Sequence, residues 1–182
     1  MPRRPKTKLH PHNRWFFAAG IFFLLLFYLY QLHLAVRLSF TSSPPAQPTL
    51  QASAPTAISI PAIKLNLPVF PTIINNNTWT IAPQGVSFLA QSARPGTPGP
   101  IILYSHNTNS RFGPIRWLAL GDKITLTTAN NLLHSYQVTQ TLTVAPSQIQ
   151  ALAATQETLI LYTCTGFFDK DRFIVRATPI SP

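Results

Sequence analysis

Apolar and polar residues alternate in short stretches from residue 58 onward. In "IKLNLPV", every second residue from Ile63 to Val69 is apolar. Further stretches of this kind are "IILYS", "GDKITLTT", "LLHSYQVTQTLTV", "TLILYTC" and "RFIVRA", with turn-forming runs such as "NNN" and "ARPGTPGP" between them. Short alternating runs bounded by turn residues predict strands, whereas only "IRWLAL" and "SQIQALAA" suggest short helices. We therefore expect a mostly β, antiparallel, barrel-like domain over residues 58–182.

A long apolar run precedes this domain. Residues 15–36, "WFFAAGIFFLLLFYLYQLHLAV", contain polar interruptions only near their end. As a helix the run would be roughly 33 Å long, enough to cross about 30 Å of hydrocarbon. A buried core helix is excluded because no polar face occurs between Trp15 and Tyr30. The run predicts one N-terminal transmembrane helix acting as a retained signal anchor.

The segment between the run and the domain is rich in proline. Residues 41–57 hold four prolines and no charge, which is typical of an extended spacer. A cleaved signal peptide is the alternative, since "ASA" at 52–54 has the form of a cleavage site. That triplet lies more than fifteen residues past the apolar run, and Pro55 follows it directly, which favours the anchor. The predicted organisation is a basic tail (1–14), a transmembrane signal anchor (15–36), a Pro-rich linker (37–57) and one domain (58–182).

The charge is unevenly distributed. The formal net charge is +10, but five basic residues and no acid lie in residues 1–14. Basic residues before an apolar run favour a cytoplasmic N-terminus, so the domain is expected on the extracytoplasmic side of the cell membrane. From residue 58 onward, eight basic and four acidic residues leave a net charge of only +4. We therefore expect a membrane partner and no nucleic acid, because the domain lacks interleaved basic and aromatic residues.

Cysteine usage narrows the chemistry. The chain has a single cysteine, Cys164, which excludes an intrachain disulfide and any cysteine-cluster metal site. We expect no metal and no cofactor. Cys164 lies where the strand "LILY" gives way to the polar residues "TCTG", at the exit of the strand. A buried structural thiol is the alternative, because free cysteines usually lie in cores.

A nucleophilic cysteine requires a base, since a thiol with a pKa of about 8.5 is mostly protonated at neutral pH. Of the two histidines in the domain, His106 ends the strand "IILYS" and begins a polar loop, where a strand can hold it at a rim. His134 lies inside "LLHSYQV" and is interpreted as a surface or structural histidine. His106 is therefore the candidate general acid and base.

An arginine follows the cysteine in the sequence. Arg172 opens the strand "RFIVRA" after a seven-residue connection from Cys164, short enough for the two segments to pair as a hairpin. The hairpin would bring the two residues together, and a fixed cation can stabilise an oxyanion by about 3 to 4 kcal/mol. Arg176 points to the same face further from the loop and is interpreted as structural.

These three residues and their flanks resemble the sortases, the membrane-anchored cysteine transpeptidases of bacterial cell surfaces. "ISIPAIKLNLPVF", "SARPGTPGPIILYSHN", "FGPIRWLALGDKITL" and "LYTC…RFIVRA" resemble successive parts of the sortase domain in the family's order. The resemblance implies a closed barrel of about eight strands. It also implies Cys164 as the nucleophile, His106 as the general acid and base, and Arg172 as the group that stabilises the oxyanion or the substrate. The substrate-binding residues are not identified by these motifs.

The resemblance further implies the reaction and its partners. Cys164 would cleave an LPXTG-like sorting signal of a secreted protein through a thioester. The acyl group would then pass to an amine acceptor, either a peptidoglycan precursor or a pilin lysine. The motifs assign no class, and classes D and E remain open. Two positions depart from the family pattern: Ser105 stands where glycine is usual, and Ile160 where threonine is frequent.

Two other functions remain open from the residues alone. One is a membrane-tethered β domain that binds a cell-surface ligand without catalysis and keeps Cys164 in its core. The other is a cysteine hydrolase on the same scaffold, in which water replaces the amine. Reactivity of the thiol would separate the first from an enzyme, and analysis of the products would separate the second from a transpeptidase.

Overall fold

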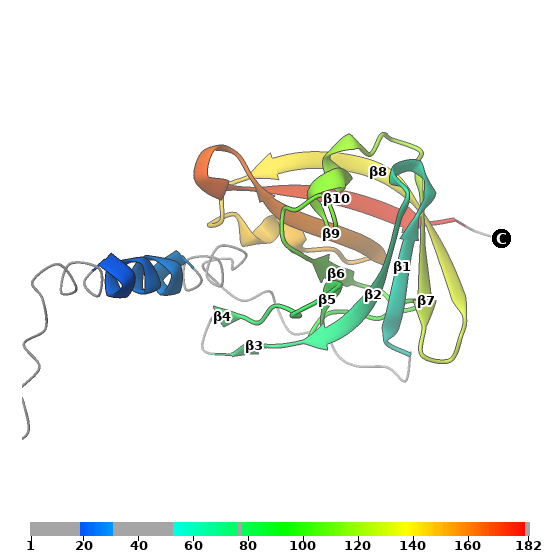
Figure 1. Ribbon diagram of the computed structural model, residues 1–182. Helices are drawn as coiled ribbons and strands as arrows, with labels where there is room; N and C mark the ends of the chain where they lie inside the picture. The colour runs from blue at the N-terminus through cyan, green and yellow to red at the C-terminus, as the bar shows by residue number, and fades with distance from the viewer. Residues whose placement is uncertain (1–18, 31–52, 76–77, 181–182) are drawn as a thin grey trace, which may run out of the picture. The chain divides into compact units, whose positions relative to one another are not determined.

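The domain is a closed β-barrel (Figure 1). The computed structural model describes residues 19–30, 53–75 and 78–180. Eight strands close in the order β1-β2-β5-β6-β9-β10-β8-β7, which confirms the expected eight-stranded barrel. The barrel strands are β1 (Pro55–Ile60), β2 (Leu65–Thr72), β5 (Val86–Leu89), β6 (Pro100–Tyr104), β7 (Lys123–Thr128), β8 (Leu133–Val144), β9 (Thr158–Thr165) and β10 (Asp171–Pro179). A separate small sheet pairs β3 (Ile74–Asn75) with β4 (Thr78–Trp79).

The connections contain only short 3-10 segments. They are η1 (Pro61–Ile63), η2 (Gly113–Trp117), η3 (Ile149–Leu152) and η4 (Phe167–Asp169). Of these, η2 overlaps the start of "IRWLAL" and η3 lies within "SQIQALAA", so each of the two expected helices is reduced to a short 3-10 segment. Both segments are followed within a few residues by polar turns and the next strand, which leaves no length for a longer helix.

The N-terminal part of the chain is a separate unit, Met1–Ala35. In it, residues 19–30 form a helix with exposed side chains. Among the residues that the structure describes, no helix combines the length and apolar character needed to cross a membrane. Residues 15–18 and 31–36 of the predicted anchor lie outside the described residues, as do the basic tail and most of the linker.

The first strand begins earlier than the expected domain boundary at residue 58. Pro55 is buried, and it pairs with Thr128 of β7 at the seam where β1 and β7 close the barrel. The backbone N–H of Ala129 also donates to the carbonyl of Ala54, at 2.9 Å. The last residues assigned to the linker are therefore part of the barrel.

Two of the eight strand pairs in the barrel are parallel. They are β2 with β5 and β6 with β9, whereas the other six pairs are antiparallel. The expectation of an antiparallel barrel was wrong for these two pairs. The reason for the second pair is the long connection from β6 to β9, which contains the whole β7–β8 hairpin and returns the chain in its original direction.

The barrel strands separate two apolar layers. One cluster, drawn from all eight strands, fills the barrel interior and includes Leu159 and Leu161 of β9. The alternate residues Ile160 and Tyr162 belong to a second cluster, which we call the outer cluster. Trp79 of β4 and Leu152 of η3 also belong to it, so these peripheral elements cover the outer face of β6, β9 and β10. Strands β6 and β9 are consequently buried on both faces.

Aromatic packing fixes the small sheet on this face. The rings of Tyr104 on β6 and Tyr162 on β9 are stacked with centroids 5.2 Å apart, and Trp79 contacts both edge-on at 5.3 and 5.6 Å. The hydroxyl of Tyr104 donates to the carbonyl of Thr80, and it shares a 2.9 Å hydrogen bond with Thr72. The outer cluster thus joins the strands that lead to His106 and Cys164 into one rigid block.

Candidate active site

His106 and Cys164 lie at the same ends of two neighbouring parallel strands. The register of β6 and β9 pairs Tyr104 with Tyr162, and the two candidate residues each follow two positions later. The pairing continues past the strand end, because the N–H of Ser105 donates to the carbonyl of Tyr162 and the hydroxyl of Thr163 donates to the carbonyl of Ser105 at 2.8 Å. Neighbouring strands are about 4.8 Å apart, so the backbones that carry His106 and Cys164 lie close together at this end of the barrel.

Arg172 lies on the other side of Cys164. In the antiparallel pair β9–β10, Arg172 is the direct partner of Cys164, which confirms the predicted hairpin. Its Nη1 donates to the carbonyls of Asp169 and Asp171, both at 3.1 Å. Cys164 and Arg172 are therefore paired on β9 and β10, and His106 lies two residues beyond the end of β6, on the other side of β9; we call these three residues the row.

This row is on the outer face of the barrel. Cys164 belongs to the outer cluster, and Tyr104, two positions before His106, and Ile174, two positions after Arg172, belong to the same cluster. Cys164 and Arg172 are each only 3% exposed. Burial alone would suit a structural thiol, but the row places a titratable base and a fixed cation next to it, and a nucleophile requires such neighbours.

The environment of His106 favours its neutral form. Its pKa is lowered from the usual value, mainly by burial and then by the nearby positive charge of Arg111, while the carboxylate of Asp169 opposes the shift. His106 is therefore a neutral imidazole at neutral pH, able to accept a proton. The neighbouring Tyr162 is fully buried, and burial raises its pKa well above the usual value, so it remains an uncharged phenol.

Two polar residues near the site were missed by the sequence interpretation. Arg111 donates to the carbonyls of Ala82 and Pro83, at 3.4 and 2.5 Å, and so holds the loop before β5 against the loop that carries His106. Asp169 accepts a 3.5 Å hydrogen bond from the side chain of Asn107. Asp169 is an acidic residue between Cys164 and Arg172 in the sequence, which could have drawn attention to it. The sequence spacing of Arg111 and Asp169 from the other site residues matches no motif that would have identified them.

The two departures from the family pattern fit the structure. The hydroxyl of Ser105 is completely buried and donates to the carbonyl of Gly85 at 2.8 Å, so it links the end of β6 to the turn before β5. Ile160 packs in the outer cluster. Neither residue displaces a member of the row.

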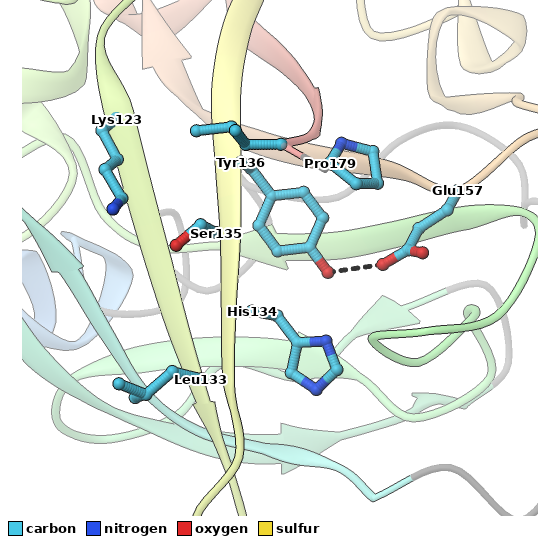
Figure 2. Close-up of a pocket in the computed structure, with 8 residues that line it drawn as sticks. Lys123, Leu133, His134, Ser135, Tyr136, Glu157 and Pro179 are labelled. Carbon is cyan, nitrogen blue, oxygen red and sulfur yellow. Dashed lines mark hydrogen bonds between the residues drawn. The ribbon is translucent and has the colours of Figure 1, made fainter. Parts of the chain in front are cut away.

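The residues set aside in the sequence analysis lie elsewhere in the barrel. Arg176 donates to the carbonyls of Ala151 and Ala153, at 2.8 and 3.1 Å, which confirms its structural role next to η3. His134 lines a different pocket of about 410 Å³ (Figure 2). There the hydroxyl of Tyr136 donates to Glu157 at 2.7 Å. The described lining of that pocket does not include any residue of the row.

The fold is thus a closed eight-stranded β-barrel with the single cysteine, a histidine and an arginine on neighbouring segments. The family model described as "Sortase domain" matches residues 58–180, more than half of the chain. The chain therefore belongs to the sortase family, and at the family level it is a sortase transpeptidase. No curated protein matches the chain.

Solved structures of several sortases share the fold. Sortase A from Corynebacterium diphtheriae is 25% identical with a TM-score of 0.61, and the match covers 72% of this chain and 63% of that chain. A Clostridium perfringens sortase D5 transpeptidase is 23% identical with a TM-score of 0.59, covering 70% and 79% of the two chains. The pilus-related sortase C of Group B Streptococcus is 22% identical with a TM-score of 0.61, covering 82% and 80%.

Proposed function

We propose that this protein is a cysteine transpeptidase that cleaves an LPXTG-like sorting signal and transfers the secreted protein to an amine of the cell wall or of a pilin. The observation that carries the proposal is the pairing of Cys164 on β9 with Arg172 on β10, together with His106 just beyond the end of the neighbouring strand β6. Membership of the sortase family supports the reaction type. The pilus-related relative makes a pilin one of the acceptors to test.

The first half-reaction uses the row as follows. Neutral His106 accepts the thiol proton of Cys164, and the thiolate attacks the carbonyl carbon of the threonine in the Thr–Gly bond. The carbonyl oxygen becomes an oxyanion, which the positive charge of Arg172 stabilises. The C–N bond then breaks, and the imidazolium returns its proton to the leaving glycine amine. The lowered pKa of His106 suits both steps, because its neutral form prevails before attack and its protonated form is a strong acid.

In the second half-reaction an amine resolves the thioester. An ammonium group first loses a proton to His106, and the free amine attacks the thioester carbonyl. The C–S bond breaks and releases the Cys164 thiolate, while the second proton of the nitrogen passes to solvent. The products are the new amide, the thiolate and the imidazolium, which together restore the starting pair.

We also propose that residues 15–36 anchor the protein in the cell membrane, with the N-terminus in the cytoplasm and residues 58–182 outside. The 22-residue apolar run and the basic residues before it support this arrangement. The linker residues before β1, 37–54, would then hold the barrel near secreted substrates that reach the same membrane.

Mass spectrometry of the full chain in detergent tests the proposed reaction. The protein is mixed with a pool of LPXTG-like peptides, with and without diglycine amide, and Cys164→Ala serves as the control. We expect a peptide thioester on Cys164 that is converted to an amine-capped product. A thioester that yields only the free acid would identify a hydrolase, and the absence of any adduct would favour a binding domain.

A further inference from the structure

The pocket shown in Figure 2 lies at the opposite end of β9 and β10 from the row. Glu157 comes directly before β9, whereas Cys164 is near the end of this strand. Ile180 likewise comes directly after β10, whereas Arg172 is near its start. At about 3.3 Å per residue, the chain from Glu157 to Cys164 spans roughly 23 Å. The proposed reaction therefore does not account for the polar side chains of this pocket.

A carboxylate is held in a fixed position at one side of the pocket. Oε1 of Glu157 accepts from the hydroxyl of Tyr136 at 2.7 Å and from the backbone N–H of Gly96 at 2.9 Å. Burial raises the pKa of Tyr136 well above its usual value, so the phenol keeps the proton that it donates. Both bonds end on the same oxygen, and Oε2 of Glu157 has no hydrogen bond among the described residues. This second oxygen is available to a cationic group.

Two basic side chains line the same pocket. Those of Lys123 on β7 and His134 on β8 have no hydrogen bond or ion pair within the part of the chain that the structure describes. The ring of His134 lies near the residue that holds the carboxylate, since a Cβ built on Gly96 would be 3.6 Å from its Cε1. Ammonium and imidazole groups both donate hydrogen bonds to phosphate oxygens. The pocket thus offers donors for an anion as well as an acceptor for a cation.

Exposed aliphatic side chains lie at the edge of the pocket. Leu133 and Ile180 line it and are 69% and 41% exposed, and the adjacent Leu132 is 56% exposed. The N–H of Ile180 donates to the carbonyl of Ser135 at 2.9 Å, which fixes the end of β10 beside β8. We call Leu132, Leu133 and Ile180 the apolar rim. The pocket volume of about 410 Å³ is in the usual range for sites that bind small ligands.

The chain enters the barrel beside the apolar rim. Ala54, the residue before β1, accepts from the N–H of Ala129 at 2.9 Å, and the N–H of Thr128 donates to the carbonyl of Leu132 at 3.0 Å. Linker residues 37–54, which follow the proposed membrane anchor, therefore join the barrel at the rim. The rim can reach the membrane surface without the linker having to run along the barrel.

We propose that this pocket binds the headgroup of a zwitterionic phospholipid, with its ammonium group against Glu157, its phosphate against Lys123 and His134, and its acyl chains next to the apolar rim. The charges of the pocket fit such a headgroup, in which a cation and an anion are neighbours. A purely anionic headgroup would place a negative charge beside the carboxylate of Glu157. This inference goes beyond the proposed reaction and rests only on the proposed membrane anchor. Headgroup binding would hold the row roughly 23 Å from the lipid headgroups, measured along β9.

Amide hydrogen exchange of the full-length protein in nanodiscs tests this site. One set of nanodiscs contains phosphatidylglycerol alone, and the other contains phosphatidylethanolamine as well. We expect residues 129–135 of the β7–β8 hairpin to exchange about fivefold more slowly in the second set, because a bound headgroup opposes local opening. Exchange of residues 15–36 in the same samples reports on the anchor, and thioester formation with a sorting peptide reports on the reaction.

Two variants remove one charge each. Glu157→Gln keeps an amide oxygen that can accept from Tyr136 and Gly96, and Lys123→Gln removes the cation. We expect each variant to lose most of the slowing by phosphatidylethanolamine. Lys64→Gln is the matched control, because it removes an exposed lysine beside η1, at the other end of β1 from the rim, and should keep the slowing. Each variant is compared with itself in the two lipids, so a general change in stability cancels.

The other outcomes overturn the inference. Equal exchange of the hairpin in both sets of nanodiscs would exclude the headgroup site. Slowing that all three variants retain would mean that the lipid acts elsewhere on the barrel, and slowing that only Lys123→Gln removes would mean that the pocket binds phosphate without the ammonium group. If residues 15–36 exchange rapidly in both sets, the anchor fails and the headgroup site fails with it. Thioester formation is independent of all these results, so failure of the proposed reaction is recognised separately.

Discussion

His106 should make the stability of the folded protein depend on pH. Burial and Arg111 lower its pKa below the value of about 6.5 that it has when unfolded. Below pH 6.5 the unfolded chain therefore binds more protons at this residue than the folded one, so the free energy of unfolding falls as the pH falls. The loss begins near pH 6.5 and levels off once the folded protein is also protonated.

We expect His106→Gln to lose less stability than the unmodified protein between pH 7.5 and pH 5. The measurement is the urea midpoint at several pH values in this range. Arg111→Met is an informative second variant, because it removes one cause of the lowered pKa and should reduce the pH dependence without removing the imidazole. Equal slopes in all three proteins would contradict this account of His106.

At Arg172, charge and geometry can be separated. Arg172→Ala removes the cation opposite Cys164 together with its two hydrogen bonds to the loop, and we expect kcat to fall about 100- to 1000-fold. Arg172→Lys keeps the positive charge but loses the guanidinium group, so its kcat should lie between that of the unmodified protein and that of the alanine variant. Single-turnover acylation of a sorting peptide measures the effect, and near-normal rates in the alanine variant would remove Arg172 from the mechanism.

Among the elements, the turn before β5 depends on a glycine for two reasons. Gly85 has a φ of +66°, and a Cβ built on it would lie 2.3 Å from the carbonyl oxygen of Pro68 on β2. Gly121 has a φ of +95°, but the nearest atom to its Cβ would be Nε2 of Gln137 at 3.8 Å. An alanine at either position would have to adopt an unfavourable positive φ. Only at position 85 would its Cβ also clash with a backbone atom, the carbonyl oxygen of Pro68.

We therefore expect Gly121→Ala to reduce the free energy of unfolding by about 1–2 kcal/mol and Gly85→Ala by more than about 3 kcal/mol. Because the carbonyl of Gly85 accepts from Ser105 next to His106, the second variant should also slow acylation. Chemical denaturation and the acylation rate measure the two effects. Similar losses of stability in both variants would show that the contact with Pro68 relaxes at little cost.

Most strands were predictable from the sequence, but β5 (Val86–Leu89) and the two parallel strand pairings were not. The alternation of apolar and polar residues predicted β2, β7 and β8, because each of these strands has one more buried and one more exposed face. Strands β6 and β9 are instead buried in nearly every residue, which is the pattern of strands covered on both faces. The continuous apolar runs "IILY" and "LILY" indicate burial on both faces. Neither run indicates which strand is its neighbour or that the two strands are parallel.

The site was predictable where the chain itself brings residues together. Cys164 and Arg172 are joined by a short hairpin, so their proximity follows from sequence spacing. His106 reaches them only through the parallel pairing of β6 with β9, and it was placed there by family resemblance. Arg111 and Asp169 affect His106 through loop conformations, which depend on backbone angles that no spacing rule fixes.

For the whole molecule, the position of the first strand sets the boundary of the stable domain. Residues before 58 contribute the pairing of Pro55 with Thr128 and a 3.2 Å hydrogen bond from the Thr56 hydroxyl to the carbonyl of Thr127. We expect a fragment of residues 53–182 to unfold cooperatively, and a fragment of residues 58–182 to have a Tm lower by about 5–10 °C. Thermal unfolding followed by circular dichroism compares the two, and equal Tm values would mean that the barrel closes without these residues.

The parallel pairing of β6 with β9 also has a consequence for the order in which the site is assembled during synthesis. Strand β6, which leads to His106, is made before the β7–β8 hairpin, whereas its neighbour β9 is made after it, and the arginine strand β10 follows β9. A chain made from its N-terminus therefore contains its histidine before its thiol, and its thiol before the arginine of β10. We expect the nascent protein to stay catalytically silent until β10 is inserted into the barrel beside β9.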